Sequence, residues 1–224
     1  MNWYKKAEEE AAVSVTPAEF GAMTREERIF LARNERITPE TQRLFFTEPY
    51  EMKGEALVSL TRNPSITPAT QLLFFTEEYE EYEDKSWALC NLAGNPSITL
   101  ETQRLFFTEK YNDKSSALNF LAQNRSIHPE TQRLFFTEKY EKKHWALWDL
   151  AGNTSITLEA QLLLFTEEYE WKVKALENLA ENPSFLRGDF TRNDWLLIKK
   201  VVRGKTKLLV LRNRLEQIYG LLFK

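Results

Sequence analysis

The chain is poor in the residues that build redox, metal and nucleotide sites. Its 224 residues include one cysteine, two histidines and seven glycines. The lone Cys90 excludes an internal disulfide framework and is typical of proteins from a reducing compartment. Cys90, His128 and His144 are too few and too widely spaced for a zinc motif or a nucleophile–base pair, and no glycine-rich phosphate loop is present. We therefore predict that the protein is not an enzyme, with no catalytic residues, no metal and no cofactor.

Long apolar runs are also missing. No stretch approaches the ~20 consecutive apolar residues that span a bilayer. The N-terminal sequence MNWYKKAEEEAAV has no apolar segment of the ~7–15 residues found in export signals. A hydrophobic fraction of 42% is nevertheless ample for a packed core. We expect a folded, cytoplasmic protein that does not associate with membranes.

What the chain does contain is an internal repeat of about 29 residues. The consensus of the copies is N-x-x-I-T-x-x-T-Q-x-L-F-F-T-E-x-Y-x-x-K-x-x-A-L-x-x-L-A before the next Asn. The intervals between successive repeat asparagines are 29, 32, 29, 29 and 29 residues, and the longer interval has three extra residues within 79–84. These asparagines are Asn34, Asn63, Asn95, Asn124, Asn153 and Asn182.

Each copy is predicted to form two helices. The first begins at a Thr-Pro pair, Thr38–Pro39 in the first copy and Thr67–Pro68 in the second, because Thr is a good N-cap and Pro fits the first helical position. The second begins near a constant lysine and carries A-L-x-x-L-A at helical spacing. It should end at the repeat asparagine, which tolerates the left-handed conformation of a helix C-cap.

One such hairpin cannot bury its apolar faces alone, whereas a stack of hairpins forms a continuous core. We therefore predict an all-α fold, an α-solenoid of five tandem helical-hairpin repeats with helical caps. The predicted parts are an N-terminal cap or half-repeat at 1–33, the five-repeat solenoid at 34–182 and a basic C-terminal helical cap at 183–224.

The two caps carry helix signals of their own. In the N-terminal cap, Thr24 and Glu27 have the spacing of a capping box. In the C-terminal cap, Thr191–Asp194 is predicted to begin one helix, and residues 206–219 are predicted to form a last amphipathic helix after Gly204.

Two stretches carry a resemblance to known repeats. In LTRNPSITPAT at 60–70 and LAGNPSITLET at 92–102, one helix ends at an Asn-Pro pair and the next begins at Thr. These stretches resemble the bacterial leucine-rich-repeat-variant family and, more loosely, HEAT-like α-solenoids, over about residues 31–185. The Q-x-L-F-F-T-E signature and the longer unit depart from the usual variant repeat. The resemblance implies a helical-repeat architecture, which serves many kinds of partner.

Polar residues that stay constant between copies are predicted to be structural. The Gln and Asn columns should form hydrogen-bonded ladders along the stack. The Glu and Lys columns should lock the turn, with Glu facing the N-terminus of the second helix and Lys reaching a carboxylate or helix-end carbonyls. Base reading by one repeat per nucleotide is the alternative, but a code must vary from repeat to repeat. His128 stands where other copies have Thr, so we expect it to replace a cap.

Positions that vary between copies fall on one stripe of the second helix, opposite the A-L-x-x-L-A face. Exposed aromatic residues among polar ones are typical of interface anchors, so we predict that this stripe binds a protein partner and that the chain is a scaffold or adaptor. In the alternative, the tryptophans lie flat over neighbouring helices. The predicted partner-binding residues are Trp87, Cys90, Asn91, Phe120, Trp145, Trp148 and Asp149.

The charge distribution supplies a second hypothesis. Residues 1–182 hold 20 Lys and Arg against 30 Asp and Glu, whereas residues 183–224 hold 10 against 3. A negative array repels phosphate, but the basic C-terminal segment is a candidate for nucleic acid or an acidic protein. A cap helix that complements the acidic array, or one that lies on a membrane surface, is the alternative. The candidate nucleic-acid-binding residues are Lys199, Lys200, Arg203, Lys205, Lys207, Arg212 and Arg214.

Overall fold

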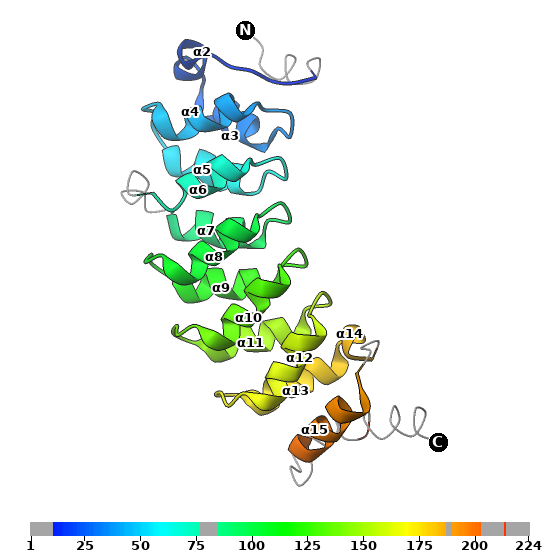
Figure 1. Cartoon of the computed structure of the whole chain (residues 1–224). Helices are drawn as coiled ribbons and strands as arrows, with labels where there is room; N and C mark the ends of the chain where they lie inside the picture. The colour runs from blue at the N-terminus through cyan, green and yellow to red at the C-terminus, as the bar shows by residue number, and fades with distance from the viewer. Residues whose placement is uncertain (1–10, 77–84, 187–189, 203–212, 214–224) are drawn as a thin grey trace. The chain divides into compact units, whose positions relative to one another are not determined.

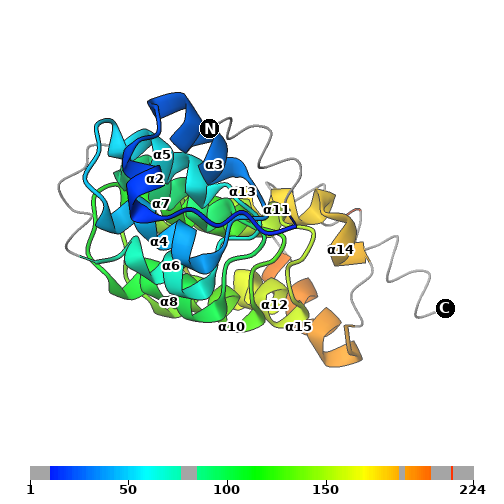
Figure 2. The same ribbon diagram turned by 90° about the horizontal axis from the view of Figure 1, so that it is seen from above.

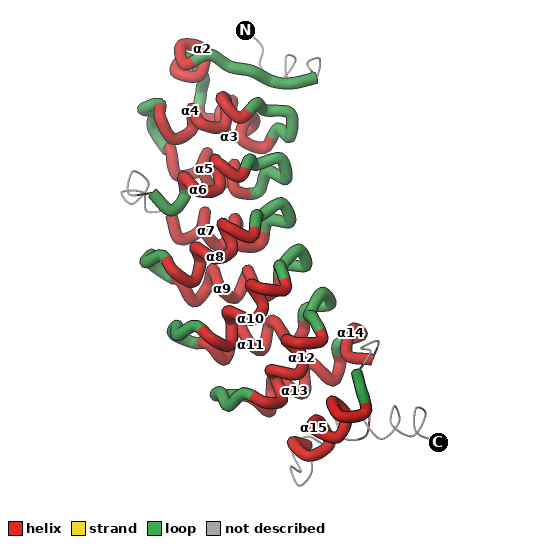
Figure 3. The backbone as a smooth tube through the Cα atoms, viewed as in Figure 1, coloured by secondary structure: helices red, strands yellow, loops and turns green. Residues whose placement is uncertain are grey.

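The structure, a computed structural model, describes residues 11–76, 85–186, 190–202 and 213 (Figure 1). In that part of the chain every regular element is a helix (Figure 3), and Val13 and Ile37 form an isolated parallel β-bridge. The all-α prediction is confirmed. No helix among the described residues is both long and apolar enough to cross a membrane.

The chain divides into two compact units, and the boundary between Phe120 and Leu121 falls inside α9 (Lys114–Gln123). The other described helices of unit 1 are α2 (Pro17–Gly21), α3 (Arg25–Arg33), α4 (Pro39–Thr47), α5 (Lys53–Thr61), α6 (Pro68–Leu73), α7 (Lys85–Gly94) and α8 (Leu100–Thr108). Those of unit 2 are α10 (Pro129–Thr137), α11 (Lys143–Gly152), α12 (Leu158–Thr166), α13 (Lys172–Glu181), α14 (Pro183–Leu186) and α15 (Arg192–Val202).

Within each unit, the second helices of successive copies pack against one another, and so do the first helices. In unit 1, α5 packs against α3 and α7, and α6 packs against α4 and α8, which places the two kinds on opposite sides (Figure 2). In unit 2, α11 packs against α13 and α10 against α12. Neighbouring helices therefore pack in a repeated pattern, as expected of a helical repeat.

The constant apolar residues form the core, as predicted. The A-L-x-x-L positions of the second helices are buried, as is the middle residue of the L-F-F stretch, which is Phe in the first four copies and Leu164 in the fifth. Edge-to-face rings at or just beyond the ends of the first helices also join successive copies in unit 1, with centroids 4.9 Å apart for Phe46 and Phe74 and 5.1 Å apart for Phe75 and Phe106. Each such pair stabilises the stack by about 1 kcal/mol beyond the area that it buries.

The predicted helix starts are confirmed. The side chains of Thr38 and Thr67 cap α4 and α6, and His128 replaces the threonine by accepting the Glu130 N–H at Nδ1, 3.2 Å away. Thr24 and Glu27 form the predicted capping box of α3. At the start of α15, Thr191 and Asp194 exchange the corresponding hydrogen bonds. The amphipathic helix predicted at 206–219 lies outside the described residues, apart from 213.

The predicted left-handed conformation at the repeat asparagine is wrong. Asn34, Asn153 and Asn182 end their helices with extended backbone, at φ between −74° and −70°. Left-handed residues instead stand immediately before the second helix, where the chain reverses to begin it. These residues are Met52, Asp113, Lys142 and Trp171, with φ of 57°, 55°, 52° and 60°.

Extended backbone frees the asparagine side chain to join successive copies. Asn63 Nδ2 donates to the backbone oxygens of Ala32 and Asn34, both at 2.9 Å, and its Oδ1 accepts the Ser65 N–H. Equivalent bonds link Asn95 to the preceding copy in unit 1, and Asn153 and Asn182 to theirs in unit 2. The predicted asparagine ladder is confirmed within each unit.

The glutamine column forms a second ladder, on the first helices. Gln42 Nε2 donates to Ser65 O and its Oε1 accepts the Thr67 N–H of the next copy, both at 2.9 Å. Gln71 and Gln132 make the same pair of bonds. The predicted glutamine ladder is therefore confirmed within each unit.

The N-terminal segment closes the first turn by imitating a glutamine. Val13 N–H donates to Arg36 O at 2.8 Å, and Val13 O accepts the Thr38 N–H at 3.0 Å. Arg36 and Thr38 occupy the positions that Ser65 and Thr67 hold one copy later. The backbone N–H and C=O of Val13 thus supply the donor and acceptor that a glutamine side chain supplies further along.

Candidate functional site

The constant lysines and tyrosines bind the protein's own backbone. Lys53 Nζ donates to Phe46 O and to Glu48 O, the latter at 3.3 Å, and Lys114 and Lys143 make the same two bonds in their copies. The predicted contact of Lys with helix-end carbonyls is confirmed. Lys172 departs from the pattern by pairing with the carboxylate of Glu168 at 3.0 Å.

The tyrosine column serves the same end of the first helix. Tyr50 and Tyr140 donate their hydroxyls to the backbone oxygens of Phe45 and Phe135, at 3.1 and 3.2 Å. Burial raises the pKa of Tyr140 well above its ordinary value. The constant Lys and Tyr side chains are thus engaged in holding the scaffold, and a binding site is expected at the variable positions.

The variable face of the second helices exposes large aromatic side chains. In unit 1, Trp87 on α7 is 64% exposed and Phe120 near the end of α9 is 41% exposed. In unit 2, Trp145 and Trp148 on α11 are 41% and 39% exposed. The structure therefore confirms that their helical phase keeps these side chains out of the core.

Trp87 borders a hollow of about 260 Å³ in unit 1. Arg33 and Arg62 line the same hollow, and so does Glu55, whose carboxylate accepts two hydrogen bonds from Arg25. The exposed indole is therefore set among charged groups, as an interface residue at a polar rim would be.

An aromatic and cationic cluster surrounds Trp145 in unit 2. The Trp171 ring lies 4.5 Å from those of Trp145 and His144, and Lys174 Nζ lies 4.0 Å from the Trp171 centroid. His144 Nδ1 is 3.2 Å from a Glu170 carboxylate oxygen. Trp145 is consequently held on one side by its neighbours and remains exposed on the other.

Two of the remaining predicted partner-binding residues are less accessible. Cys90 is buried, and burial, with a smaller contribution from the charge of Asp113, raises the pKa of its thiol to about 11. It is therefore a core residue and lies outside the exposed face. Asn91 is half-buried, and its Nδ2 has no hydrogen-bond partner among the described residues.

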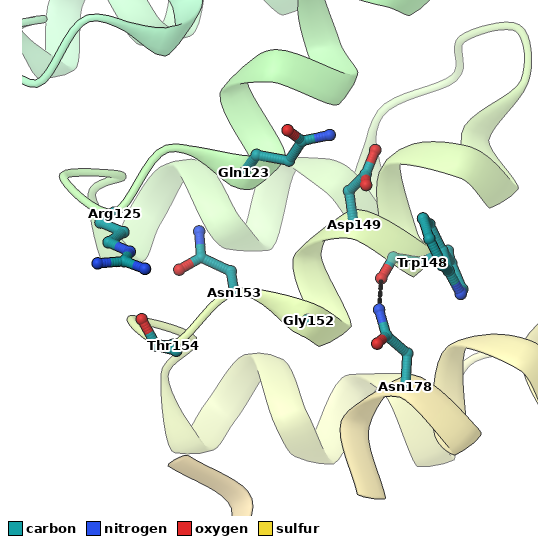
Figure 4. Close-up of a pocket in the computed structure, with 8 residues that line it drawn as sticks. All are labelled: Gln123, Arg125, Trp148, Asp149, Gly152, Asn153, Thr154 and Asn178. Atoms are coloured by element: carbon teal, nitrogen blue, oxygen red, sulfur yellow. Dashed lines mark hydrogen bonds between the residues drawn. The ribbon is translucent and has the colours of Figure 1, made fainter. Parts of the chain in front are cut away.

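Asp149 lies in a hollow of unit 2 that extends from Trp148 to the turn carrying Arg125 (Figure 4). Burial raises the pKa of its carboxyl from the ordinary 3.8 to about 6, against a smaller lowering by a hydrogen bond from Gln123. The pKa rises because burial removes water from the carboxylate, and desolvation without a paired cation disfavours the charged form. A half-buried, charged carboxylate at neutral pH is a feature that functional sites share.

The raised pKa of Asp149 predicts a specific dependence of stability on pH. Between pH 3.8 and about 6 the folded protein holds a proton that the unfolded chain releases, so the contribution of Asp149 to stability falls as pH rises through this window. Asp149→Asn should therefore raise the free energy of unfolding near pH 7.5 by about 1 kcal/mol, after allowance for solvent screening, and by less near pH 5. Urea unfolding of both proteins at the two pH values measures this, and a pH-independent difference would contradict it.

The basic residues of the alternative site are mostly outside the described part of the chain. Lys199 and Lys200 are exposed near the end of α15. The others, which the structure does not describe, are Arg203, Lys205, Lys207, Arg212 and Arg214.

Sequence reasoning missed several residues that adjoin the predicted face. Trp171 was hidden because it stands in the turn before the second helix, and Gln123 because it stands at a helix end. Asn178 occupies the position on α13 that Asp149 occupies on α11, but it lacks the aromatic signal. Only packing brings Gln123 and Asn178 to the same hollow as Asp149.

No group of three or more His, Cys, Asp or Glu that could hold a metal ion occurs within the described ranges. Comparisons of the chain with models of protein families, with curated proteins and with solved structures found no match. The architecture and the residues of the two units therefore carry the functional argument.

Proposed function

We propose that the protein is a cytoplasmic, non-enzymatic scaffold or adaptor that binds another protein through the variable face of its second helices. The proposed architecture is an α-solenoid of five repeats with helical caps, related to the leucine-rich-repeat-variant and HEAT-like solenoids through the Asn-Pro and Thr signals at the helix ends.

The observation that carries the proposal is the contrast between constant and variable positions. Constant Gln, Asn, Lys and Tyr side chains are engaged with the protein's own backbone, whereas Trp87, Phe120, Trp145 and Trp148 are exposed at positions that differ between copies. Exposed indoles are costly in water, and tryptophan is enriched among the residues that dominate protein–protein binding energy. The net charge of −10 over residues 1–182 disfavours a phosphate backbone as the ligand of this face.

Site-specific crosslinking identifies the partner directly. A photoreactive phenylalanine analogue in place of Trp87 or Phe120 should join the full chain to one discrete protein in cell extract, which mass spectrometry then names. The same analogue in place of Leu196, an exposed residue of α15 outside the variable face, is the matched control and should not give this product.

The affinity of that partner should depend on the tryptophans of α11. Trp145→Ala together with Trp148→Ala should weaken binding at least tenfold by calorimetry, because truncated aromatic anchors lose more than about 2 kcal/mol of binding. The unfolding midpoint should fall only slightly, since both side chains are partly exposed. Leu196→Ala should leave the affinity unchanged.

The nucleic-acid alternative predicts a different pattern. Nucleic acid would replace protein in the crosslinked product, binding would collapse at moderate salt, and Lys199→Ala with Lys200→Ala would weaken it while the tryptophan variants would not. That result would overturn the proposed function.

A further inference from the structure

The hollow beside Trp148 has the dimensions of a side-chain pocket. Its volume is about 240 Å³, below the ~300–1,000 Å³ of pockets that enclose drug-sized ligands. Its lining comes from α11 and the turn that follows it, from α13, and from the last residue of α9 and the turn that precedes α10 (Figure 4). The lining residues are Gln123, Arg125, Trp148, Asp149, Gly152, Asn153, Thr154 and Asn178.

Amide donors in the hollow are already used within the protein. Asn178 Nδ2 donates to Trp148 O at 2.8 Å (Figure 4), and a hydrogen bond from Gln123 lowers the pKa of Asp149. Asn153 Nδ2 donates to Ala122 O at 2.7 Å and to Asn124 O at 2.9 Å. The amide oxygens of Gln123 and Asn178 and the carboxylate oxygens of Asp149 are hydrogen-bond acceptors of residues that line the hollow.

Gly152 makes this arrangement of Asn178 feasible. A Cβ at residue 152 would lie 2.7 Å from Asn178 Nδ2, too close for the bond to Trp148 O to survive unchanged. At the equivalent position of the earlier copy, a Cβ on Gly94 would meet only Phe120 Cδ1, at an ordinary 3.9 Å. The close approach is therefore particular to this hollow.

At one end of the hollow, the negative charge of Asp149 is available to a cation. Asp149 and Arg125 are the two charged residues that line it, and the described residues contain no ion pair between them. Figure 4 shows Arg125 and the Trp148 indole at opposite ends of the group, with Asp149 nearer the indole. A cation beside Asp149 and Trp148 would therefore gain a carboxylate partner and an aromatic face while staying apart from Arg125.

We propose that this hollow binds an arginine side chain of the partner protein, with Asp149 as its counter-ion and Trp148 as its stacking surface. A planar guanidinium presents five donors and stacks on aromatic rings, which matches a site of several acceptors beside an indole better than the point charge of lysine does. Within unit 2, residues 121–182 hold 7 Lys and Arg against 10 Asp and Glu, and this negative balance favours the approach of such a basic segment. This inference rests on the proposed function, because the arginine is taken to belong to the bound protein.

A small probe tests the hollow without the partner. N-acetyl-arginine amide should shift the indole N–H resonance of Trp148 in the ¹⁵N-labelled full chain saturably, with a Kd on the order of 1–10 mM, as one side chain can supply. The citrulline analogue, which has the same shape and no charge, should bind at least tenfold more weakly. Trp148→Phe assigns the resonance.

Two variants and a pH series identify the groups. Asp149→Asn should reduce arginine binding to the level of citrulline, and Gly152→Ala should weaken it severalfold by displacing Asn178. Lowering the pH from about 7.5 to about 5 should weaken arginine binding to the wild type by protonating Asp149, while Arg125 stays charged. A pH effect of the same size in Asp149→Asn would contradict the proposal.

The inference is overturned if arginine and citrulline bind equally, if Asp149→Asn binds arginine as well as the wild type, or if the wild type gives no saturable shift. These results are distinct from failure of the proposed function. If a protein is captured through the tryptophans but arginine does not bind, the inference fails and the proposed function stands. If arginine binds but no protein is captured, the assignment of the pocket stands and the scaffold role fails.

Discussion

Replacing Asn63 with alanine should destabilise the protein by about 3 kcal/mol, whereas the same change at Asn34 should cost about 1 kcal/mol. Both side chains accept the N–H two residues ahead, Ser65 for Asn63 and Arg36 for Asn34, at 2.8 Å. Asn63 additionally donates to Ala32 O and Asn34 O, and it is buried. The pair of variants therefore shares the local turn bond and differs in the bonds to the preceding copy.

Urea unfolding followed by circular dichroism measures both free energies. The slope of the free energy of unfolding with urea concentration should be the same for the two variants, because both expose the same surface on unfolding. Equal slopes allow the two midpoints to be compared directly. The expected difference of about 2 kcal/mol corresponds to roughly a thirtyfold change in the unfolding equilibrium. Equal losses at the two positions would mean that the asparagine ladder contributes nothing beyond its own turn.

The ladders also show which part of the fold a sequence can reveal. Residues that recur at a fixed interval must answer the same local requirement in each copy, so the helix pairs, the threonine caps and the structural use of Asn, Gln and Lys were predictable. The left-handed turn was not, because Met52, Asp113, Lys142 and Trp171 share no residue type that would announce it. The contribution of Val13 was equally hidden, since a backbone amide takes the place of a side chain.

The candidate site divides in the same way. Helical phase alone correctly kept Trp87 and Trp148 out of the core. It failed for Cys90, which occupies the same position in its copy as Trp148 and is buried. That position lies at the edge of the stripe, where the small side chain of Cys90 is buried and the larger indole of Trp148 stays partly exposed. Phase fixes the direction of a residue, while side-chain size decides whether it reaches solvent.

The two ends of the glutamine ladder in unit 2 should respond to the same substitution in opposite ways. Gln132 donates to Ser155 O at 3.0 Å and accepts from Thr157 N–H at 2.8 Å and from Thr157 Oγ1 at 3.1 Å. Gln161, equally buried, donates to Ile156 O at 3.4 Å, and its Oε1 has no hydrogen-bond partner within the part of the chain that the structure describes. The turn that would accept the next rung is replaced by α14.

Methionine is close to glutamine in length and removes only the amide. Gln132→Met should lower the free energy of unfolding by about 3 kcal/mol, because it leaves the Ser155 carbonyl and the Thr157 N–H without their partners. Gln161→Met should be neutral or stabilising by up to about 1 kcal/mol, because it removes an unpaired buried oxygen and retains the packing. Urea unfolding of the two variants at one pH compares them directly. A loss at Gln161 as large as that at Gln132 would show that the Gln161 oxygen is fully satisfied in solution, and that the ladder does not end there.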